Sequence, residues 1–276
     1  MNTKKKATPY KVITAIALAI LAILFTFPLY WIITGSLKDA AAINSAIPQW
    51  FPTAPTLDNY ARLFAKPSIK WLLNTVIMAV AAMGLTCLTS SLAGYALAKK
   101  RFTGRQLLFT LMVCAMALPK QVILIPLLKE MSFLHLHDTL WAVILPTVGW
   151  PFGVFLMKQF SENIPTEMLE AARIDGAGEA LTFTKIVFPM IKPGVGALAI
   201  FTFINSWNDY FLQLIMLNSS KALTISLGIA KMQAEMATDF GLIMAGAALA
   251  AVPIITVFLM FQSYFTQGIT MGAVKG

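Results

Sequence analysis

The stretch EMLEAARIDGAGEALTFTKIVFPMIKPG, residues 167–194, is the longest charged interval in a chain that is otherwise mostly apolar. Pro165, just before it, is well placed at a helix start, because the missing N–H of proline costs nothing in the first turn. Glu167 and Glu170 fall in the first turns, where carboxylates complement the helix dipole. The stretch is therefore predicted to begin as a helix. It carries more charged residues and helix signals than a simple connecting loop requires.

Two glycines predict a sharp turn after this helix. Gly176 and Gly178 allow backbone conformations that other residues avoid. A second short helix is predicted over about residues 179–187, with its end at Pro189. The pattern predicts a compact helix-turn-helix hairpin with a small apex, and such an apex is suited to docking into a cleft on another protein.

The composition of the whole chain indicates an integral membrane protein. Of the 276 residues, 58% are hydrophobic and only 12% are charged, and the mean hydropathy is +0.74. Soluble domains are nearer half apolar and a quarter charged. The net charge of +9 would suit nucleic acid in a soluble protein, but here it sits in short loops and tails, where basic residues set membrane orientation. We therefore expect membrane lipid around the chain and no nucleic-acid partner.

Long apolar runs predict about six membrane-spanning helices, since a helix needs roughly 20 apolar residues to cross the hydrocarbon core. Pro119 and Pro126 interrupt the third run, and Pro146 and Pro151 interrupt the fourth. Such breaks are tolerated where neighbouring helices or water satisfy the freed backbone groups, so they fit a bundle that lines a pathway as well as ordinary kinks. The predicted spans are residues 12–34, 71–97, 106–128, 140–157, 193–217 and 242–265.

The distribution of basic residues predicts the orientation of the chain. With the N-terminus inside, thirteen of the 21 lysines and arginines fall on the inner side, most clearly in the short loop KKRFTGR, residues 99–105. The hairpin then faces the cytoplasm, and we expect one transmembrane domain, residues 1–276, with both termini cytoplasmic. The predicted cytoplasmic segments are residues 1–11, 158–192 and 266–276, and the extracellular segment is residues 35–70 with an interfacial helix near residues 58–64.

The hairpin resembles the EAA loop of permease subunits of binding-protein-dependent ABC importers. That loop has the form E-A-A, three residues, G, nine residues, I, one residue, L-P, and this chain departs from it only at Phe188, where leucine is usual. The matching residues, all at the required spacing, are Glu170, Ala171, Ala172, Gly176, Ile186 and Pro189.

This resemblance implies an all-α permease fold in a bacterial-type inner membrane, with a hairpin that couples the fold to a separate ATPase. In the family the loop is a coupling helix seated in a groove of an ATP-binding subunit, whose dimer uses ATP and Mg²⁺. A second, homologous permease is also implied as a partner, and no enzyme activity or bound cofactor is implied for this chain. The implied coupling residues are Glu167, Glu170, Ala171, Ala172, Asp175, Gly176 and Ala177.

Two further stretches resemble a carbohydrate subfamily of these importers. The tail FQSYFTQGITMGAVKG, residues 261–276, and the stretch FINSWNDYFLQLIML, residues 203–217, are similar to permeases related to the smaller permease subunit of the maltose transporter. This similarity implies uptake of a di- or oligosaccharide delivered by an extracellular sugar-binding protein, without indicating which sugar. An importer for peptides or amino acids remains the alternative. A secondary transporter is disfavoured, because internal repeats and several intramembrane carboxylates are not evident.

One group of polar residues falls inside the fifth predicted span. Asp209 is the only acidic residue placed well within a span, and Asn205, Trp207 and Asn208 lie close to it in sequence. An ionisable group at membrane depth is costly, so it usually faces a cavity or a partner. Asparagine amides and a tryptophan ring also suit the hydroxyls and C–H faces of a sugar. We expect Asn205 and Asp209 to line a transport pathway, and the alternative is that Asn208 and Asp209 bond to neighbouring helices or a partner subunit.

Other candidate sites are weaker. His135 and His137, with Asp138 beside them, offer too few ligands to predict a metal site, so a solvated loop is favoured. Cys87 and Cys114 lie in apolar runs and are interpreted as packing residues rather than as a disulfide or metal pair. The sequence has no G-x-x-x-x-G-K-[ST] motif, so we do not expect the chain itself to hydrolyse ATP.

Overall fold

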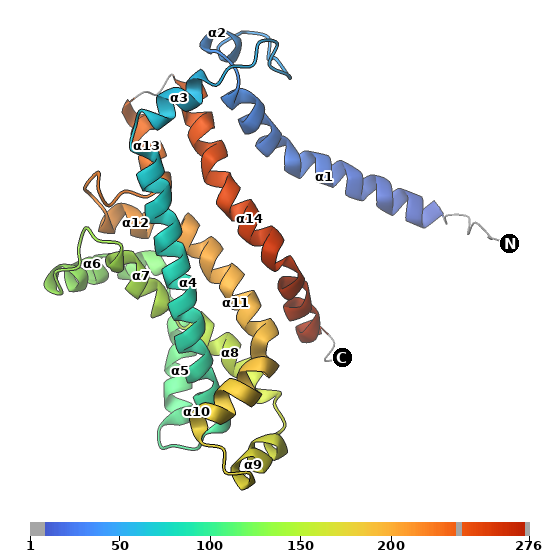
Figure 1. The fold of residues 1–276 in the computed structure, drawn as a ribbon, viewed down its shortest axis with the longest axis vertical. Coiled ribbons are helices and arrows are strands. Elements are labelled where there is room, and N and C mark those ends of the chain that lie inside the picture. Colours follow the sequence, from blue (N-terminus) through green and yellow to red (C-terminus); the bar gives the residue numbers. More distant parts are fainter. Residues whose placement is uncertain (1–8, 236–238, 274–276) are drawn as a thin grey trace. The chain divides into compact units, whose positions relative to one another are not determined.

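The computed structural model of the chain describes residues 9–235 and 239–273, and it describes side chains for residues 10–235 and 239–262. Every regular element in these ranges is a helix (Figure 1). Five of the helices are long and apolar enough to cross a membrane, and a sharply bent pair adds a sixth if it counts as one span. The all-α membrane fold predicted from the sequence is thereby confirmed. Of the two predicted tails, residues 1–8 and 274–276 lie outside the described residues.

The chain forms two compact units. The first comprises residues 1–68 and 229–251, and the second comprises residues 69–228 and 252–276. The elements of the first unit are α1 (Pro9–Ser36), α2 (Ala40–Ile43), α3 (Asp58–Phe64), most of α13 (Ile225–Glu235) and the beginning of α14 (Phe240–Ala273). The interfacial helix expected near residues 58–64 is present as α3.

Polar side chains hold α3 in place within the first unit. The buried amide of Asn59 donates to the carbonyl oxygens of Ser36 and Lys38, at 2.9 and 2.7 Å. Arg62 forms an ion pair with Asp239, just before α14, and the nearest nitrogen and oxygen are 2.5 Å apart. The bonds from Asn59 pair the carbonyl of Ser36, at the end of α1, and that of Lys38, just after the helix.

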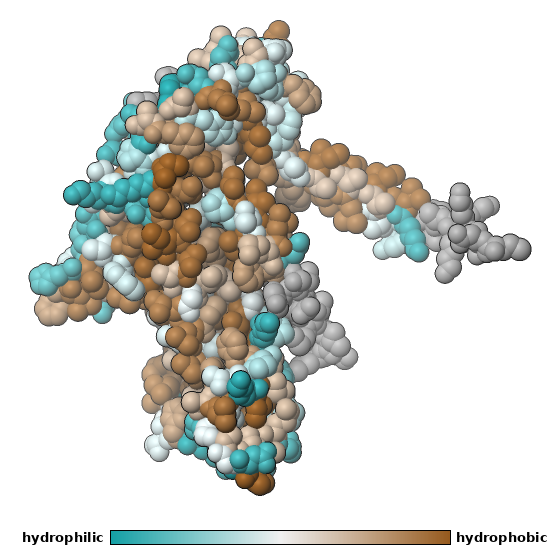
Figure 2. Space-filling view, viewed as in Figure 1, coloured by the Kyte–Doolittle hydropathy of each residue, from teal (hydrophilic) through white to brown (hydrophobic). Residues whose placement is uncertain are grey.

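The long helix α1 makes little contact with the rest of its own unit. Its most apolar 18-residue window is 0% buried, and Figure 2 shows hydrophobic side chains over most of its length. Near its end, Phe27 and Trp31 pack against Trp50 with ring centroids 5.9 and 6.1 Å apart. An apolar surface of this length is unfavourable in water, so it needs lipid or another protein around it.

The second unit contains the remaining helices. Within it, α8 packs against both α5 and α11, while α12 packs against α6 and α7. The elements of this unit are α4 (Ser68–Lys99), α5 (Arg105–Met116), η1 (Lys120–Ile123), α6 (Leu124–Phe133), α7 (Trp141–Val148), α8 (Phe152–Glu162), α9 (Thr166–Ile174), α10 (Glu179–Thr182), η2 (Phe183–Val187), α11 (Phe188–Asn208) and α12 (Tyr210–Met216).

Small residues bring α4 and α8 into close contact. A Cβ atom placed on Gly94 would lie 2.6 Å from the backbone nitrogen of Lys158, and one placed on Gly153 would lie 2.3 Å from the hydroxyl of Ser90. Ser90 and Gly94 are one helical turn apart, so they form a strip of small residues along α4. Such strips allow membrane helices to approach closely and gain van der Waals contact.

An apolar core lies behind the hairpin formed by α9 and α10, which Figure 1 shows at one end of this unit, beside the ends of α4 and α8. Its members come from α4, α8, α9, η2 and α11 and from the loop between α8 and α9, so the hairpin and the spans share one packed cluster. Close packing of this kind transmits displacement between elements, because protein interiors have few voids. The buried members are Tyr95, Met157, Ile164, Leu169, Val187, Ile191 and Leu198.

The prediction that the second helix of the hairpin ends at Pro189 is wrong. Helix continues without a break from Glu179 to Asn208, through α10, η2 and α11. The element η2 is a π-helical turn, closed by a hydrogen bond from the N–H of Phe188 to the carbonyl of Phe183. Pro189 then occupies the first turn of the renewed α-helix, where its missing N–H is not required.

Three helices of the second unit are interrupted. The predicted third span bends by 102° between α5 and η1, next to Pro119. The predicted fourth span is interrupted between α7 and α8 at residues 149–151. The predicted fifth span, 193–217, is wrong at both ends, because the helix starts earlier and stops at Asp209, whose backbone dihedrals of −76° and 70° are not helical. Asp209 therefore lies at a break and not well within a helix.

Candidate functional site

The turn of the hairpin is a well-formed helix C-terminus. Gly176 has φ of 78°, in the left-handed region that favours glycine. Its N–H donates to the carbonyl of Arg173 at 3.0 Å, and the N–H of Ala177 donates to the carbonyl of Ala172 at 2.9 Å. These two bonds are the Schellman arrangement, which satisfies the last carbonyls of a helix. The sequence-based prediction of a turn at Gly176 is confirmed.

Most of the residues implied as coupling contacts lie on the outside of this hairpin. Ala172 is an exception, because it is only 6% exposed and packs inward. Ile174 was not singled out by the sequence, yet 86% of its surface is exposed near the apex. A large aliphatic side chain so exposed suits contact with another protein. The exposed residues of the implied set are Glu167, Glu170, Ala171, Asp175 and Gly176, and Ala177 is half-buried.

Two consecutive lysines from the end of α4 hold the hairpin to the spans. Lys100 forms an ion pair with Glu179, at the start of α10, with 2.5 Å between nitrogen and oxygen. Lys99 donates to the carbonyl oxygens of Glu162 and Ile164, at 3.1 and 2.6 Å. The segment before α9 and the start of α10 are therefore both bonded to residues 99–105, the loop with the clearest excess of basic residues.

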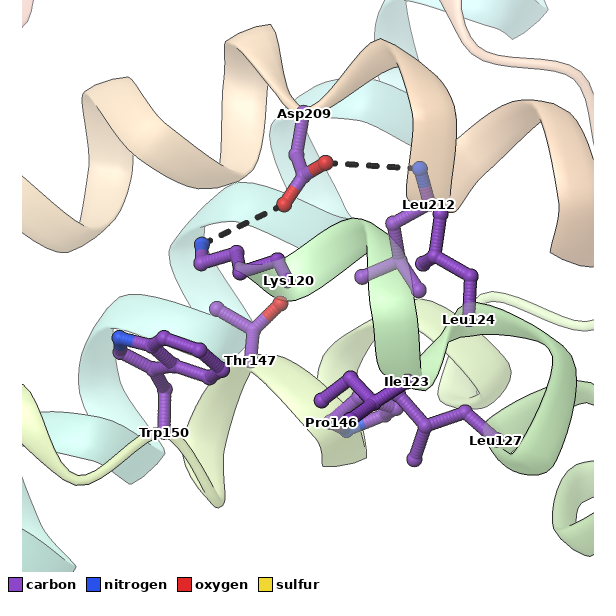
Figure 3. A pocket seen from close by; sticks show the side chains of 9 residues that line it. All are labelled: Lys120, Ile123, Leu124, Leu127, Pro146, Thr147, Trp150, Asp209 and Leu212. Carbon is purple, nitrogen blue, oxygen red and sulfur yellow. Dashed lines mark hydrogen bonds and ion pairs between the residues drawn. The ribbon is translucent and has the colours of Figure 1, made fainter. Parts of the chain in front are cut away.

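A second candidate region lies where the interrupted helices meet (Figure 3). The ammonium group of Lys120 is 3.5 Å from a carboxylate oxygen of Asp209 and 5.0 Å from the ring centre of Trp150. The other carboxylate oxygen of Asp209 accepts from the backbone N–H of Leu212 at 3.4 Å and so caps α12. These groups line a hollow of about 30 Å³, together with Thr147 and several aliphatic side chains.

A neighbouring hollow of about 30 Å³ shares Lys120, Thr147 and Trp150 with the first. The amide nitrogen of Asn205 donates to the carbonyl of Phe201 at 2.8 Å, which leaves the amide oxygen able to accept another bond. Thr86 is buried, and its hydroxyl has no hydrogen-bond partner among the residues that the structure describes. The other residues around this hollow are Phe152, Gly153, Leu198, Phe201 and Thr202.

Of the four residues considered for the pathway from the sequence, two line a hollow and two do not. Asn205 and Asp209 line the two neighbouring hollows. Trp207 is 1% exposed and packs on Phe203 with ring centroids 5.5 Å apart, so its side chain lines neither hollow. Asn208 is exposed, and its amide donates to the carbonyl of Ile204 at 2.9 Å.

Sequence reasoning missed Lys120 and Trp150, although both carried a signal. Lys120 is a basic residue inside the predicted span 106–128, and an ionisable residue at such a position usually marks a functional or paired site. Trp150 directly precedes Pro151, at the position where the fourth span breaks.

Comparison with known proteins now decides the family. Residues 90–271 match the family described as binding-protein-dependent transport system inner membrane component. The chain belongs to this family.

Known relatives match this chain over nearly its whole length. The chain is 34% identical over 274 residues to the arabinooligosaccharides transport system permease protein of Bacillus subtilis (strain 168), and the match covers 97% of this chain and 96% of that protein. It is 35% identical over 265 residues to the sulfoquinovosyl glycerol transport system permease protein of Agrobacterium fabrum, covering 95% and 93%. The maltodextrin transport system permease protein of Bacillus subtilis is 31% identical over 280 residues and covers 100% of both chains.

A crystal structure of another protein supports the fold of this chain. The matching chain comes from a bacterial ABC transporter involved in the import of the acidic polysaccharide alginate. The TM-score is 0.83 at 21% sequence identity, and the match covers 96% of this chain and 99% of that chain. The arrangement of helices is thus that of an ABC importer permease.

Asp138, on the loop between α6 and α7, has a structural role in this chain. One of its carboxylate oxygens accepts from the backbone N–H groups of Asn218 and Ser219, at 2.7 and 2.9 Å, and its own N–H donates to the carbonyl of Met216 at 2.9 Å. Burial alone would raise the pKa of Asp138, but the hydrogen bonds from Ser219 and Asn218 and the nearby His137 outweigh it and hold the pKa below its usual range. Asp138 therefore joins the α6–α7 loop to the segment after α12.

An Asp138→Ala variant should melt at a lower temperature, because it loses two charge-assisted hydrogen bonds worth about 1–3 kcal/mol in total. A lowered pKa in the folded protein gives stability that is full above the unfolded pKa of about 3.9 and is lost as the pH falls below it. The gap to wild type in melting temperature, followed in detergent, should be steady from neutral pH to about pH 5 and shrink below pH 4. An unchanged melting temperature at neutral pH would show that the two loops are held independently of Asp138.

Proposed function

We propose that the chain is one permease subunit of an ATP-driven importer of a di- or oligosaccharide, and that it forms half of the translocation pathway. The relatives support a sugar as cargo, because their names assign them to arabinooligosaccharides, sulfoquinovosyl glycerol and maltodextrin. The other half of the pathway comes from a second, homologous permease, and an extracellular sugar-binding protein delivers the cargo. A crystal structure of the alginate transporter in complex with a saccharide-bound periplasmic protein is consistent with such a partner.

The observation that carries this proposal is the ordered hairpin with its exposed apex. Its Schellman turn fixes the direction of the chain, and Ile174 stands out from the surface beside the acidic side chains of Glu170 and Asp175. In the proposed complex this apex docks on one copy of an ATP-binding subunit. ATP and Mg²⁺ are used by that partner, while this chain provides no catalytic group and binds no cofactor. The proposed contacts are Glu167, Glu170, Ala171, Ile174, Asp175, Gly176 and Ala177, with Ala172 supporting them from inside.

The proposed transport cycle follows from the connection between the hairpin and the hollows. Closure of the ATPase dimer moves the hairpin, and the shared apolar core and the continuous helix from Glu179 to Asn208 carry the movement to Asp209. ATP binding favours an outward-open pathway and hydrolysis resets it. Asn205 and Asp209 lie along the pathway in this scheme. The positive-inside bias supports a cytoplasmic position for the hairpin and for both termini.

The experiment that tests this function is purification of the chain from its native membrane in a mild detergent, with mass spectrometry of the proteins that accompany it. We expect a second six-span permease and an ATPase with a Walker motif. The recovered complex, placed in liposomes with the sugar-binding protein, should take up sugar only when ATP is supplied. A chain that purifies alone and transports sugar without ATP would instead identify a secondary transporter.

Removing both pathway groups should impair transport without preventing assembly. Each of Asn205 and Asp209 offers hydrogen bonds worth about 1 kcal/mol or more, so the Asn205→Ala, Asp209→Ala double variant should lose roughly tenfold or more in uptake. Uptake per assembled complex is the quantity to measure, with Asn208→Ala as the control, because that amide lies outside both hollows. Wild-type uptake by the assembled double variant would remove these residues from the pathway.

A further inference from the structure

Three breaks in the membrane helices place one chemically distinct side chain each at the same spot. Lys120 follows the break at Pro119, Trp150 lies in the break between α7 and α8, and Asp209 forms the break between α11 and α12. Figure 3 shows the three side chains around one hollow, each from a different interrupted span. Interrupted helices at membrane depth are tolerated where they line a cavity, so their convergence indicates a built site.

The ammonium group of Lys120 is incompletely paired in this arrangement. It has three N–H donors, and in the part of the chain that the structure describes its contacts are one carboxylate oxygen at 3.5 Å and the ring of Trp150 at 5.0 Å. A charged group in a membrane span is costly unless oxygen atoms surround it. Lys120 is therefore able to donate to an incoming ligand. The hydroxyl of Thr86 in the neighbouring hollow, which has no partner within the described part of the chain, is another group able to bond.

We propose that Lys120, Trp150 and Asp209 bind a ring of a neutral saccharide during its passage. This assignment rests on the proposed function and names the cargo contacts within it. The ring of Trp150 covers a C–H face of the sugar, and Lys120 donates to a hydroxyl oxygen. Asp209 and the amide oxygen of Asn205 accept from sugar hydroxyls. A vicinal pair of hydroxyls, each both donor and acceptor, matches this combination of donor, acceptors and aromatic face.

The charges around the site favour a neutral cargo over an acidic one. The charges of Lys120 and Asp209 cancel one another, and neither hollow is lined by another ionisable residue among those that the structure describes. A sugar carboxylate drawn to Lys120 would also approach Asp209, and like charges about 4 Å apart repel by several kcal/mol at the dielectric near a protein surface. The proposed site therefore selects against uronic acids.

The hollows must join before a sugar can enter. Each is about 30 Å³, which is enough for a water molecule but far from enough for a sugar ring. The side chain of Lys120 lines both hollows, together with Thr147 and Trp150. In the proposed site the two hollows widen and join during the transport cycle, and the groups that they share then face the sugar ring.

The test uses the complete transporter with its ATPase, second permease and binding protein in liposomes. The probes are arabinotriose and maltotriose as neutral sugars and trigalacturonate as an acidic one, and the readout is sugar moved per ATP hydrolysed. Trp150→Ala and Lys120→Met should each lower this ratio for the transported neutral probe by about tenfold, while Trp150→Phe should retain most of it. The matched controls are Trp141→Ala on α7 and Lys129→Met on α6, which line neither hollow.

The Asp209→Asn variant provides a second test of the site, because it removes the negative charge that offsets the positive charge of Lys120. This variant should raise the uptake of trigalacturonate relative to the neutral probe by at least about threefold. Wild-type ratios in both Trp150→Ala and Lys120→Met, or no change in charge preference in Asp209→Asn, would overturn the site while leaving the importer intact. Uptake of a neutral probe by the wild-type complex without ATP would instead overturn the proposed function.

Discussion

A Gly176→Pro variant should assemble in the membrane but lose at least tenfold in ATP-driven uptake. Gly176 has φ of 78°, whereas proline is fixed near −65°. Proline also removes the N–H that bonds to the carbonyl of Arg173. The expected local cost is about 3 kcal/mol or more, and it falls on the turn that presents Ile174 and Asp175. The hairpin should therefore lose its docking shape, while the spans keep their packing.

Two glycines in the same turn supply a matched control. A Cβ atom would meet nothing within 4 Å at either Gly176 or Gly178. The two positions therefore differ in backbone conformation and not in the space available for a side chain. Gly178 has φ of −70°, which any residue adopts. Gly176→Ala should cost about 1–2 kcal/mol and weaken coupling, and Gly178→Ala should behave as wild type.

Uptake and ATP hydrolysis, measured separately on purified complexes, distinguish weak docking from lost coupling. Glu170→Lys, which reverses an exposed charge on the same hairpin, should likewise weaken ATPase binding or uncouple hydrolysis from uptake. Sugar uptake at the wild-type rate by Gly176→Pro would mean that this turn is not the docking site.

The largest effect on folding is expected from Gly94→Leu. A Cβ atom at this position would lie 2.6 Å from the backbone nitrogen of Lys158 and 2.7 Å from the backbone carbon of Met157. Neither backbone atom can move without shifting α8, which also carries the packing of α5 and α11. Overpacking costs about 1–3 kcal/mol where side chains can adjust, and more where backbone must move. The variant should be recovered at low yield or with a melting temperature lowered by well over 5 °C.

Gly84→Leu is the control for this substitution, because it lies on the same helix and a Cβ atom there meets nothing within 4 Å. Both variants add the same side chain to α4, so a difference between them reports the contact with α8. Size-exclusion profiles and melting curves in detergent are sufficient to compare them. Equal behaviour of Gly94→Leu and Gly84→Leu would show that α4 and α8 are not closely packed in the membrane.

The sequence was sufficient for the features that depend on local chemistry. Hydropathy placed the membrane helices, and the φ requirement of Gly176 located the turn of the hairpin. The boundaries of α3, Asp58–Phe64, also agree with the prediction. Each of these features is written within a short window of residues, so pattern and propensity are enough to find it.

Features that depend on tertiary structure could not be read in this way. Pro189 was expected to stop a helix, but a π-helical turn before it removes the conflict. Lys120 and Asp209 are 89 positions apart in the chain, and only the folding of two broken spans brings them together. The helical period also puts Ala172 inside and Ile174 outside, a distinction that needs the partner helices of the core to be known.

The uninterrupted helix from the hairpin to Asp209 gives the molecule a mechanical lever. Its 30 residues correspond to a rod of about 45 Å at 1.5 Å per residue. A tilt of roughly 10° about one end would carry the other end through about 8 Å, more than the width of a sugar ring. The π-helical turn lies close to the Glu179 end, where a wider and less regular turn supplies compliance at the fulcrum. A small rotation in the cytoplasm is thus geometrically sufficient to open or close a passage about eight helical turns away without any part of the rod unfolding.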